Sequence, residues 1–154
     1  SLKNRYQLQT NRLINDLSKR ITIYPYGLSD SKGLVTFLDN QGNSTGRSRI
    51  EETNPDTLEE HKFDRIEIQT ERLDDLIQPA DQKILIKIDV EGHEKNVIEG
   101  MKEILSNNNC VLQVEVFQDA QKRFLAAMSN LGYRLFKQIG ADHYFCNDKF
   151  NYSA

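Results

Sequence analysis

The sequence lacks the features that mark membrane proteins and nucleic-acid-binding proteins. None of its apolar runs approaches the roughly 20 residues that cross a bilayer. Acids and bases are interspersed and the net charge is -3, so there is no basic cluster of the kind that binds nucleic acid. No secretory signal is visible, because the N-terminus is polar and helix-like. We therefore expect a cytoplasmic protein with neither a membrane nor a nucleic acid as a partner.

Cysteine is also scarce. Cys110 and Cys146 are the two cysteines, and each lies inside an apolar, strand-like run. Such surroundings favour buried free thiols over a disulfide and agree with a reducing compartment. The chain has 154 residues, enough for one domain with a core of its own. We expect residues 1–154 to form a single domain.

The most informative stretch is residues 83–94, with the sequence KILIKIDVEGHE. Residues 84–89 are apolar except for Lys87 and the terminal acid, which predicts a short buried strand. A tight turn follows, and a helix begins at His93. In a parallel sheet such a strand ends at the carboxyl edge, where open α/β sheets bind ligands. The candidate site residues at this edge are Asp89, Glu91, His93 and Glu94.

The remaining elements follow from hydrophobic periodicity. Helices are predicted over 2–19, from 93 to the asparagines at 107–109, and over 118–131, with a short helical turn at 71–77. Strands are predicted over 21–26, 34–38, 65–70, 110–117, 133–138 and 143–147. The first two strands would form a hairpin and the last two an antiparallel pair. A polar loop is predicted over 39–48, and the charged segment 49–64 is expected to be exposed. Strand and helix alternate from 84 to 135, which favours an α/β fold with a parallel sheet.

Several motifs occur in the order in which one enzyme family carries them. The segment KIDVEGHE at 87–94 is followed by Val97-Ile98 and Gly100. The others are GLSD at 27–30, NSTG at 43–46, TERLDDL at 70–76 and LGY at 131–133. With these motifs the chain resembles FkbM-type methyltransferases, which use S-adenosylmethionine, over nearly its whole length.

The resemblance implies a Rossmann-like class I methyltransferase sheet, mostly parallel with an antiparallel C-terminal strand. It implies S-adenosylmethionine as cofactor and O-methyl transfer to a small-molecule or glycan hydroxyl. Ser29 or Asp30 would lie near the adenine, and Asp89 near the methyl group and the acceptor. Asp89 and His93 are then the catalytic candidates, and the acceptor side is assigned to Glu91, Glu94 and Glu115.

Each candidate also has a purely structural interpretation. Asp89 could orient or deprotonate an acceptor hydroxyl, or simply cap the turn. Glu91 and Glu94 suit a helix N-terminus in any case. His93 could be a general base near neutral pH or an exposed residue. Glu115 interrupts an apolar strand, and a buried carboxylate there needs a partner or a raised pKa.

The acids and His93 together could bind a divalent metal ion. Their spacing fits no standard ligand pattern such as His-Glu-x-x-His, so we predict no metal.

One part of the family pattern is missing from the sequence. No two of the eight glycines form Gly-x-Gly, and no strand is predicted before residue 21. The chain thus resembles the C-terminal two-thirds of a methyltransferase domain without its first two strands. In the usual strand order, 3-2-1-4-5-7-6, these strands separate 21–26 from 84–89. The chain could be a fragment, the two strands could pair directly, or a second chain could cover the edge as a homo-oligomer.

Three hypotheses for function follow. The first is the methyltransferase domain just described. The second is a non-catalytic, truncated α/β module that acts through protein contacts or self-association. The third is a small hydrolase or metal-binding domain built on Asp89, Glu91 and His93.

Overall fold

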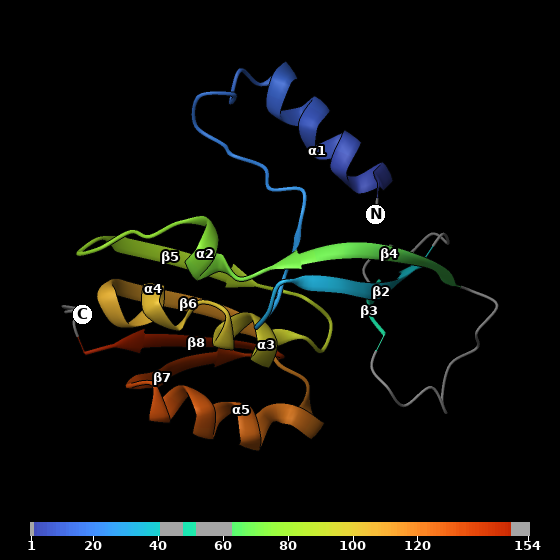
Figure 1. Ribbon diagram of the computed structural model, residues 1–154. Helices are drawn as coiled ribbons and strands as arrows, with labels where there is room; N and C mark the ends of the chain where they lie inside the picture. The colour runs from blue at the N-terminus through green and yellow to red at the C-terminus, as the bar shows by residue number, and fades with distance from the viewer. Residues whose placement is uncertain (1, 41–47, 52–62, 149–154) are drawn as a thin grey trace.

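The computed structural model describes residues 2–40, 48–51 and 63–148 (Figure 1). They form a mixed α/β fold with two four-stranded sheets. The helices are α1 (Leu2–Ile14), α2 (Leu73–Leu76), α3 (Glu94–Glu99), α4 (Lys102–Asn107) and α5 (Gln118–Asn130). The strands are β1 (Gly27–Leu28), β2 (Gly33–Asn40), β3 (Arg49–Ile50), β4 (Phe63–Glu71), β5 (Lys83–Ile88), β6 (Asn109–Glu115), β7 (Tyr133–Ile139) and β8 (Asp142–Asn147). The motif at 43–46 and most of the predicted polar loop and charged segment lie outside the described residues.

The first sheet has the strand order β1-β4-β2-β3. Strand β2 runs antiparallel to β4 along its whole length, and β1 lies parallel to the end of β4. The predicted strand over 21–26 does not form, so its hairpin with 34–38 is also wrong. Pro25 in that run has no N–H for a ladder, and Ile21, Tyr24 and Tyr26 are exposed, so the run gains little from pairing.

The second sheet has the order β5-β6-β8-β7. Only β5 and β6 are parallel in it, whereas β6–β8 and β7–β8 are antiparallel. The antiparallel pair at the C-terminal end is confirmed. The prediction of a mostly parallel sheet is wrong, because antiparallel contacts make up four of the six strand pairings among the described residues.

The two sheets share no strand pairing within the described part of the chain. Strand β1 pairs with β4, and β5 pairs with β6. Direct pairing between the segments 21–26 and 84–89, one of the three alternatives, is therefore wrong. Strand β5 is an edge strand, and its predicted burial is also wrong, since Leu85 is 81% exposed.

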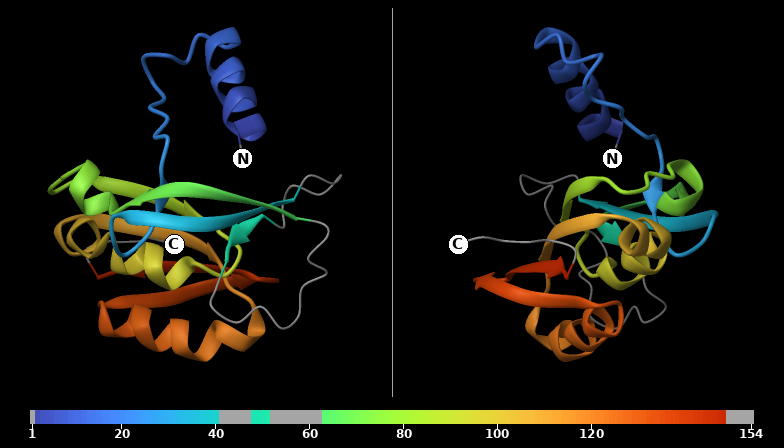
Figure 2. Two further views of the ribbon diagram at one scale, coloured as in Figure 1. Left: turned by 45° about the vertical axis from the view of Figure 1, so that its right-hand side comes forward. Right: turned by 90° about the vertical axis from the view of Figure 1, so that its left-hand side faces the viewer.

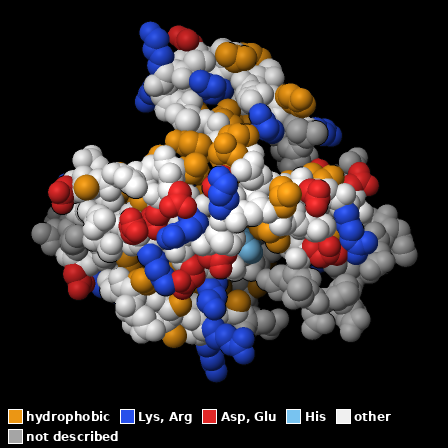
Figure 3. Space-filling model, in the orientation of Figure 1, with side chains coloured by type: hydrophobic (Ala, Val, Ile, Leu, Met, Phe, Trp, Pro, Cys, Tyr) orange, Lys and Arg blue, Asp and Glu red, His pale blue; other side chains and the backbone are white. Residues whose placement is uncertain are grey.

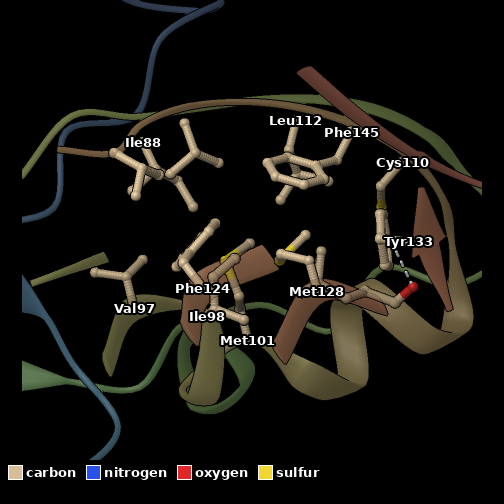
Figure 4. Packing of buried hydrophobic residues seen from close by; sticks show 13 residues of the cluster. Ile88, Val97, Ile98, Met101, Cys110, Leu112, Phe124, Met128, Tyr133 and Phe145 are labelled. Atoms are coloured by element: carbon tan, nitrogen blue, oxygen red, sulfur yellow. Dashed lines mark hydrogen bonds between the residues drawn. The ribbon is translucent and has the colours of Figure 1, made fainter. Parts of the chain in front are cut away.

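The core lies between the second sheet and the helices α3, α4 and α5, which all cover the same side of it (Figure 2). The predicted periodic residues Val97, Ile98, Met101, Ile104 and Leu105 are all buried. Figure 4 shows side chains of α3 and α5 facing the sheet; the rings of Phe124 and Phe145, for example, meet edge to face at 5.9 Å. Cys110 and Cys146 are buried free thiols, as predicted.

The helix predicted after β5 is divided at Gly100 and Met101 into α3 and α4. A Cβ atom at Gly100 would lie 1.9 Å from the carbonyl oxygen of Ser29. Only a glycine permits this approach, which brings the end of α3 against the loop after β1. The break therefore positions a loop that carries candidate site residues.

Helix α1 stands away from both sheets on the connecting segment 15–26 (Figures 1 and 2). It ends at Ile14, earlier than predicted, and Asp16 has a positive φ of 52° that the helix cannot continue through. No described helix has the length and apolar character needed to span a bilayer.

Candidate functional site

The turn between β5 and α3 has a constrained backbone. Glu91 has a φ of 52° and Gly92 a φ of 104°; the left-handed region is uncommon for a residue with a side chain. Glu94 is buried, and its Oε1 accepts a hydrogen bond of 2.8 Å from the N–H of Gly92. The carboxylate of Glu94 thus fixes the turn that presents Glu91. This hydrogen bond does not test the predicted contact of Glu94 with an acceptor.

Ser29 joins the loop after β1 to the start of α3. Its side chain is buried, and its N–H donates to the carbonyl of Glu71 at 3.0 Å. Its Oγ lies 3.0 Å from Oδ1 of Asp30 and 3.0 Å from Nε2 of His93. The structure therefore brings together three predicted site residues that belong to distant parts of the chain.

The direction of these bonds follows from hydrogen counting. A hydroxyl has one hydrogen, and Ser29 donates it to Asp30. The oxygen of Ser29 then accepts from Nε2–H of His93. In this tautomer Nε2 of His93 carries the hydrogen and is a donor toward Ser29.

Asp30 is held as a carboxylate at the surface. Burial acts to raise its pKa, but hydrogen bonds from Ser29, Asn96 and Ser31 together outweigh it and hold the pKa below its ordinary value. Asp30 also lines a surface pocket of about 430 Å³ with Lys95, Asn96 and Glu99. An ionised carboxylate accepts hydrogen bonds, so one that lies beside an open pocket suits a ligand with N–H or O–H donors.

A second cluster lies at the carboxyl ends of β5 and β6. Carboxylate oxygens of Asp89, Glu91 and Glu115 all fall within 4.8 Å of one another. Nζ of Lys87 lies 2.6 Å from Oδ2 of Asp89. In this cluster Glu115 lies beside the turn after β5, and its predicted contact with an acceptor is not tested. Oxygen ligands at this spacing could hold a divalent cation, and the prediction of no metal is not tested.

The pKa values of two carboxyl groups in this cluster, Asp89 and Glu115, are shifted in opposite directions. The hydrogen bond from Lys87 lowers the pKa of Asp89. The hydrogen bond between Glu115 and Asp89 raises the pKa of Glu115, and burial and the nearby Glu91 and Asp142 raise it further. Glu115 therefore keeps its proton to higher pH, and Asp89 is the ionised partner that can accept one.

Sequence reasoning missed Lys87, Asn96 and the close approach at Gly100. Lys87 lies two positions before Asp89, on the same side of the strand, and Asn96 lies one helical turn after His93. Both spacings can be read from the sequence and would have placed these residues near the site. The contact of Gly100 with Ser29 has no local signal, because it joins residues that are far apart in sequence.

The comparison with protein families decides the identity of the chain. The model of the methyltransferase FkbM domain matches residues 2–135. The chain belongs to the FkbM methyltransferase family. This membership confirms the resemblance and supports methyltransferase activity in general. Both clusters, from Ser29 to Glu115, lie inside the part that matches the FkbM domain. No curated protein and no solved structure matches the chain.

Proposed function

We propose that this FkbM-family chain contributes the acceptor side and the adenine side of an S-adenosylmethionine-dependent O-methyltransferase with a Rossmann-like arrangement. The acceptor is a hydroxyl of a small molecule or a glycan. The observation that carries the proposal is that carboxylate oxygens of Asp89 and Glu115 lie within 4.8 Å of one another at the carboxyl ends of the neighbouring parallel strands β5 and β6.

The cofactor would supply an electrophilic methyl group on a positively charged sulfur. Asp89 would accept the hydrogen bond of the acceptor hydroxyl, orient its oxygen and take its proton as the methyl group leaves the sulfur, which becomes a neutral thioether, and joins the oxygen. Glu115 would hold Asp89 in place through their shared hydrogen bond. Lys87 keeps Asp89 ionised, so that it is ready to accept the proton.

The described residues fit the adenine part of the cofactor. The carboxylate of Asp30 could accept a hydrogen bond from the exocyclic amino group of adenine. Asp30 also lines a pocket whose volume lies within the usual range of ligand sites, roughly 300–1,000 Å³. Ser29, His93 and Asn96 would fix its orientation. The sequence offers no Gly-x-Gly for the methionine part of the cofactor, so we assign no residue to it.

Equilibrium binding of S-adenosylhomocysteine to the 154-residue chain tests the cofactor side. Calorimetry should give binding that Asp30→Asn weakens about tenfold or more, because a charged hydrogen bond is lost. Asp64→Asn, at an exposed position on β4, is the matched control and should leave binding unchanged. Absence of binding at millimolar ligand, or equal losses in both variants, would refute the adenine assignment.

Transfer of a labelled methyl group to a panel of hydroxylated acceptors tests the chemistry. Asp89→Asn should lower the rate by about 10²–10⁴-fold, as expected for loss of a general base. The affinity for S-adenosylhomocysteine should change little if Asp89 acts on the acceptor.

The second candidate function is a non-catalytic module that acts through protein contacts. The observation that favours it is the exposed apolar surface of α1, where Leu13 is 67% and Ile14 is 77% exposed. A chain that binds S-adenosylhomocysteine but transfers no methyl group to any acceptor would support this alternative.

A further inference from the structure

A pocket beside the start of α5 has no part in the proposed methyl transfer. It lies where β6 leads into α5, next to the turn between β7 and β8. Its volume is about 330 Å³, at the lower end of the usual range of ligand sites, roughly 300–1,000 Å³. Phe117, Gln121, Gln138 and His143 are among the residues that line it. A pocket of this size suits one ring of a ligand with its substituents.

His143 forms a buried and well-held part of the pocket wall. It is 1% exposed, and its ring stacks on that of Phe145 with 6.4 Å between the centroids. Its Nδ1 lies 2.8 Å from the carbonyl oxygen of Ala141. A carbonyl oxygen can only accept, so Nδ1 carries a hydrogen and donates it. The orientation of the imidazole is therefore fixed by packing on one side and by a hydrogen bond on the other.

The other ring nitrogen of His143 orients the carboxamide of Gln121. Nε2 of Gln121 lies 2.9 Å from Nε2 of His143. An amide nitrogen can only donate, so Nε2 of His143 carries no hydrogen in this arrangement and accepts the bond. This bond uses one N–H of Gln121, and the carboxamide has a further N–H donor and an oxygen acceptor. The buried histidine thus prepares a hydrogen-bonding group at the pocket before any ligand arrives.

A second carboxamide at the pocket is held in a similar way. Nε2 of Gln138 donates to the carbonyl oxygen of Gly140 at 3.1 Å. Like Gln121, Gln138 has a further N–H and an oxygen that can bond to a ligand. The pocket therefore offers donors and acceptors together, which matches a ligand whose own groups do both.

Phe117 adds an apolar surface to these polar groups. Its side chain is 49% exposed. None of the described residues that line the pocket is a lysine, arginine, aspartate or glutamate. Charged side chains of both signs are spread over the face of the molecule in Figure 3, so the pocket differs from that surface. It favours a neutral ligand, because a charged ligand would lose hydration without gaining an ionic partner.

We propose that this pocket binds one neutral sugar ring. A sugar ring has a face of C–H groups, which packs on an aromatic ring, and hydroxyls around its rim, which both donate and accept hydrogen bonds. The C–H face lies on Phe117, and the hydroxyls bond to the carboxamides of Gln121 and Gln138. His143 is a positioning residue that keeps Gln121 aligned. The proposal concerns binding alone and does not rest on methyl transfer.

NMR titration of the isotope-labelled 154-residue chain tests the site. The probes are the methyl glycosides of glucose, galactose and mannose, with adenosine as a flat aromatic probe and glucuronate as a charged one. At least one glycoside should bind with a dissociation constant of about 1–10 mM, because a single ring buries little surface. The largest changes in chemical shift should occur at Phe117, at Gln121 and in the turn at 140–141. Adenosine and glucuronate should bind more weakly.

Substitutions at the pocket should weaken this binding. Phe117→Ala and Gln121→Leu should each raise the dissociation constant about two- to tenfold. Phe117 is exposed and Gln121 is half-buried, so both variants should unfold near the wild-type temperature. Tyr6→Ala and Gln7→Leu, at exposed positions on α1, are the matched controls and should bind like wild type.

The positioning role of His143 has its own test. His143→Phe keeps an aromatic ring but removes the acceptor for Gln121, so it should bind the glycoside about two- to tenfold more weakly. His143→Gln, whose side-chain oxygen can accept that bond, should recover part of the affinity. Equal affinities of these two variants would overturn the positioning role.

Three results would overturn the sugar site itself. The first is no binding of any glycoside at up to about 100 mM, far above the expected dissociation constants. The second is binding of adenosine or glucuronate that is tighter than that of every glycoside. The third is glycoside binding that Phe117→Ala and Gln121→Leu both leave unchanged.

Discussion

The hydroxyl of Ser29 lies 3.0 Å from Nε2 of His93, across 64 residues of sequence. The contact ties the loop after β1, in the first sheet, to the start of α3, which follows β5 of the second sheet. Because Ser29 donates its one hydroxyl hydrogen to Asp30, its oxygen accepts from Nε2–H of His93. His93 is thus a positioning residue for Asp30 in the geometry described here, and its predicted catalytic role is not tested.

Replacement of His93 should weaken the binding of S-adenosylhomocysteine at Asp30 without changing the residues that line the pocket. His93→Ala removes the donor to Ser29, and loss of one neutral hydrogen bond costs about 0.5–1.5 kcal/mol. The affinity for S-adenosylhomocysteine should therefore fall about two- to tenfold. His93→Gln, which keeps a donor, should recover part of it. A His93→Ala variant that binds as tightly as wild type would contradict the positioning role.

Gly100→Ala should destabilise the fold strongly. The added Cβ would meet the carbonyl oxygen of Ser29 at 1.9 Å, and this backbone cannot move without disturbing the loop after β1. We expect a loss of about 1–3 kcal/mol in the free energy of unfolding, measured by urea denaturation. Gly33→Ala is the control, because its nearest neighbour, Oγ1 of Thr70, lies 3.9 Å away; it should cost much less.

Asp74 connects α2 to the beginning of α4 and should be needed for stability. Its side chain is buried, and its two oxygens accept hydrogen bonds from the N–H groups of Glu103, at 3.1 Å, and Ile104, at 3.0 Å. Asp74→Ala leaves both donors unsatisfied and should cost about 1–3 kcal/mol in thermal or urea unfolding. The neighbouring Asp75 is exposed, so Asp75→Ala should stay within about 0.5 kcal/mol of wild type.

The pair of Asp89 and Glu115 should make stability depend on pH. The pKa of Glu115 is raised above its ordinary value of 4.5. Its stabilising contribution is therefore fully present below that value and is lost as pH rises through the folded-state pKa. Glu115→Gln keeps a donor toward Asp89 at every pH. Relative to wild type, this variant should gain stability as pH rises from about 4 to about 7.

Melting temperatures of both proteins across this range would measure the effect. It should be small, because Glu115 is only partly buried and the solvent screens its interactions. The lowered pKa of Asp89 has the opposite effect on stability. The stability that the interactions of ionised Asp89 contribute is lost when pH falls through its folded-state pKa. Glu67→Gln, at an exposed position on β4, is the control. A constant difference between Glu115→Gln and wild type would argue against the raised pKa of Glu115.

Local patterns predicted the parts of the fold that depend on local physics. The 3.6-residue period of Val97, Ile98 and Met101 located the helical segment after β5, and all three are buried. The acidic end of β5 was located from its strand and turn pattern. The motifs between Ser29 and Glu94 led to the family, which the FkbM match confirms.

The errors arose where a segment's structure depends on distant neighbours. The run 21–26 has β-branched and aromatic residues typical of a strand, yet Tyr24 and Tyr26 are exposed and none of the described strands pairs with them. Residues 84–89 look like a strand buried on both faces, but the described helices cover one face only. Burial is a property of what packs against a strand, and that information is not contained in the strand's own residues.

Strand β5 has no partner strand on one edge within the described residues, and this has a consequence for how the protein must be handled. Five residues, Lys83 to Lys87, combine an apolar centre with unpaired backbone donors and acceptors, which is a template for the growth of intermolecular β-structure. The two lysines at its ends repel an identical strand that approaches in register. Conditions that neutralise or screen these ammonium groups, such as high pH or concentrated salt, will therefore promote precipitation of an otherwise folded chain.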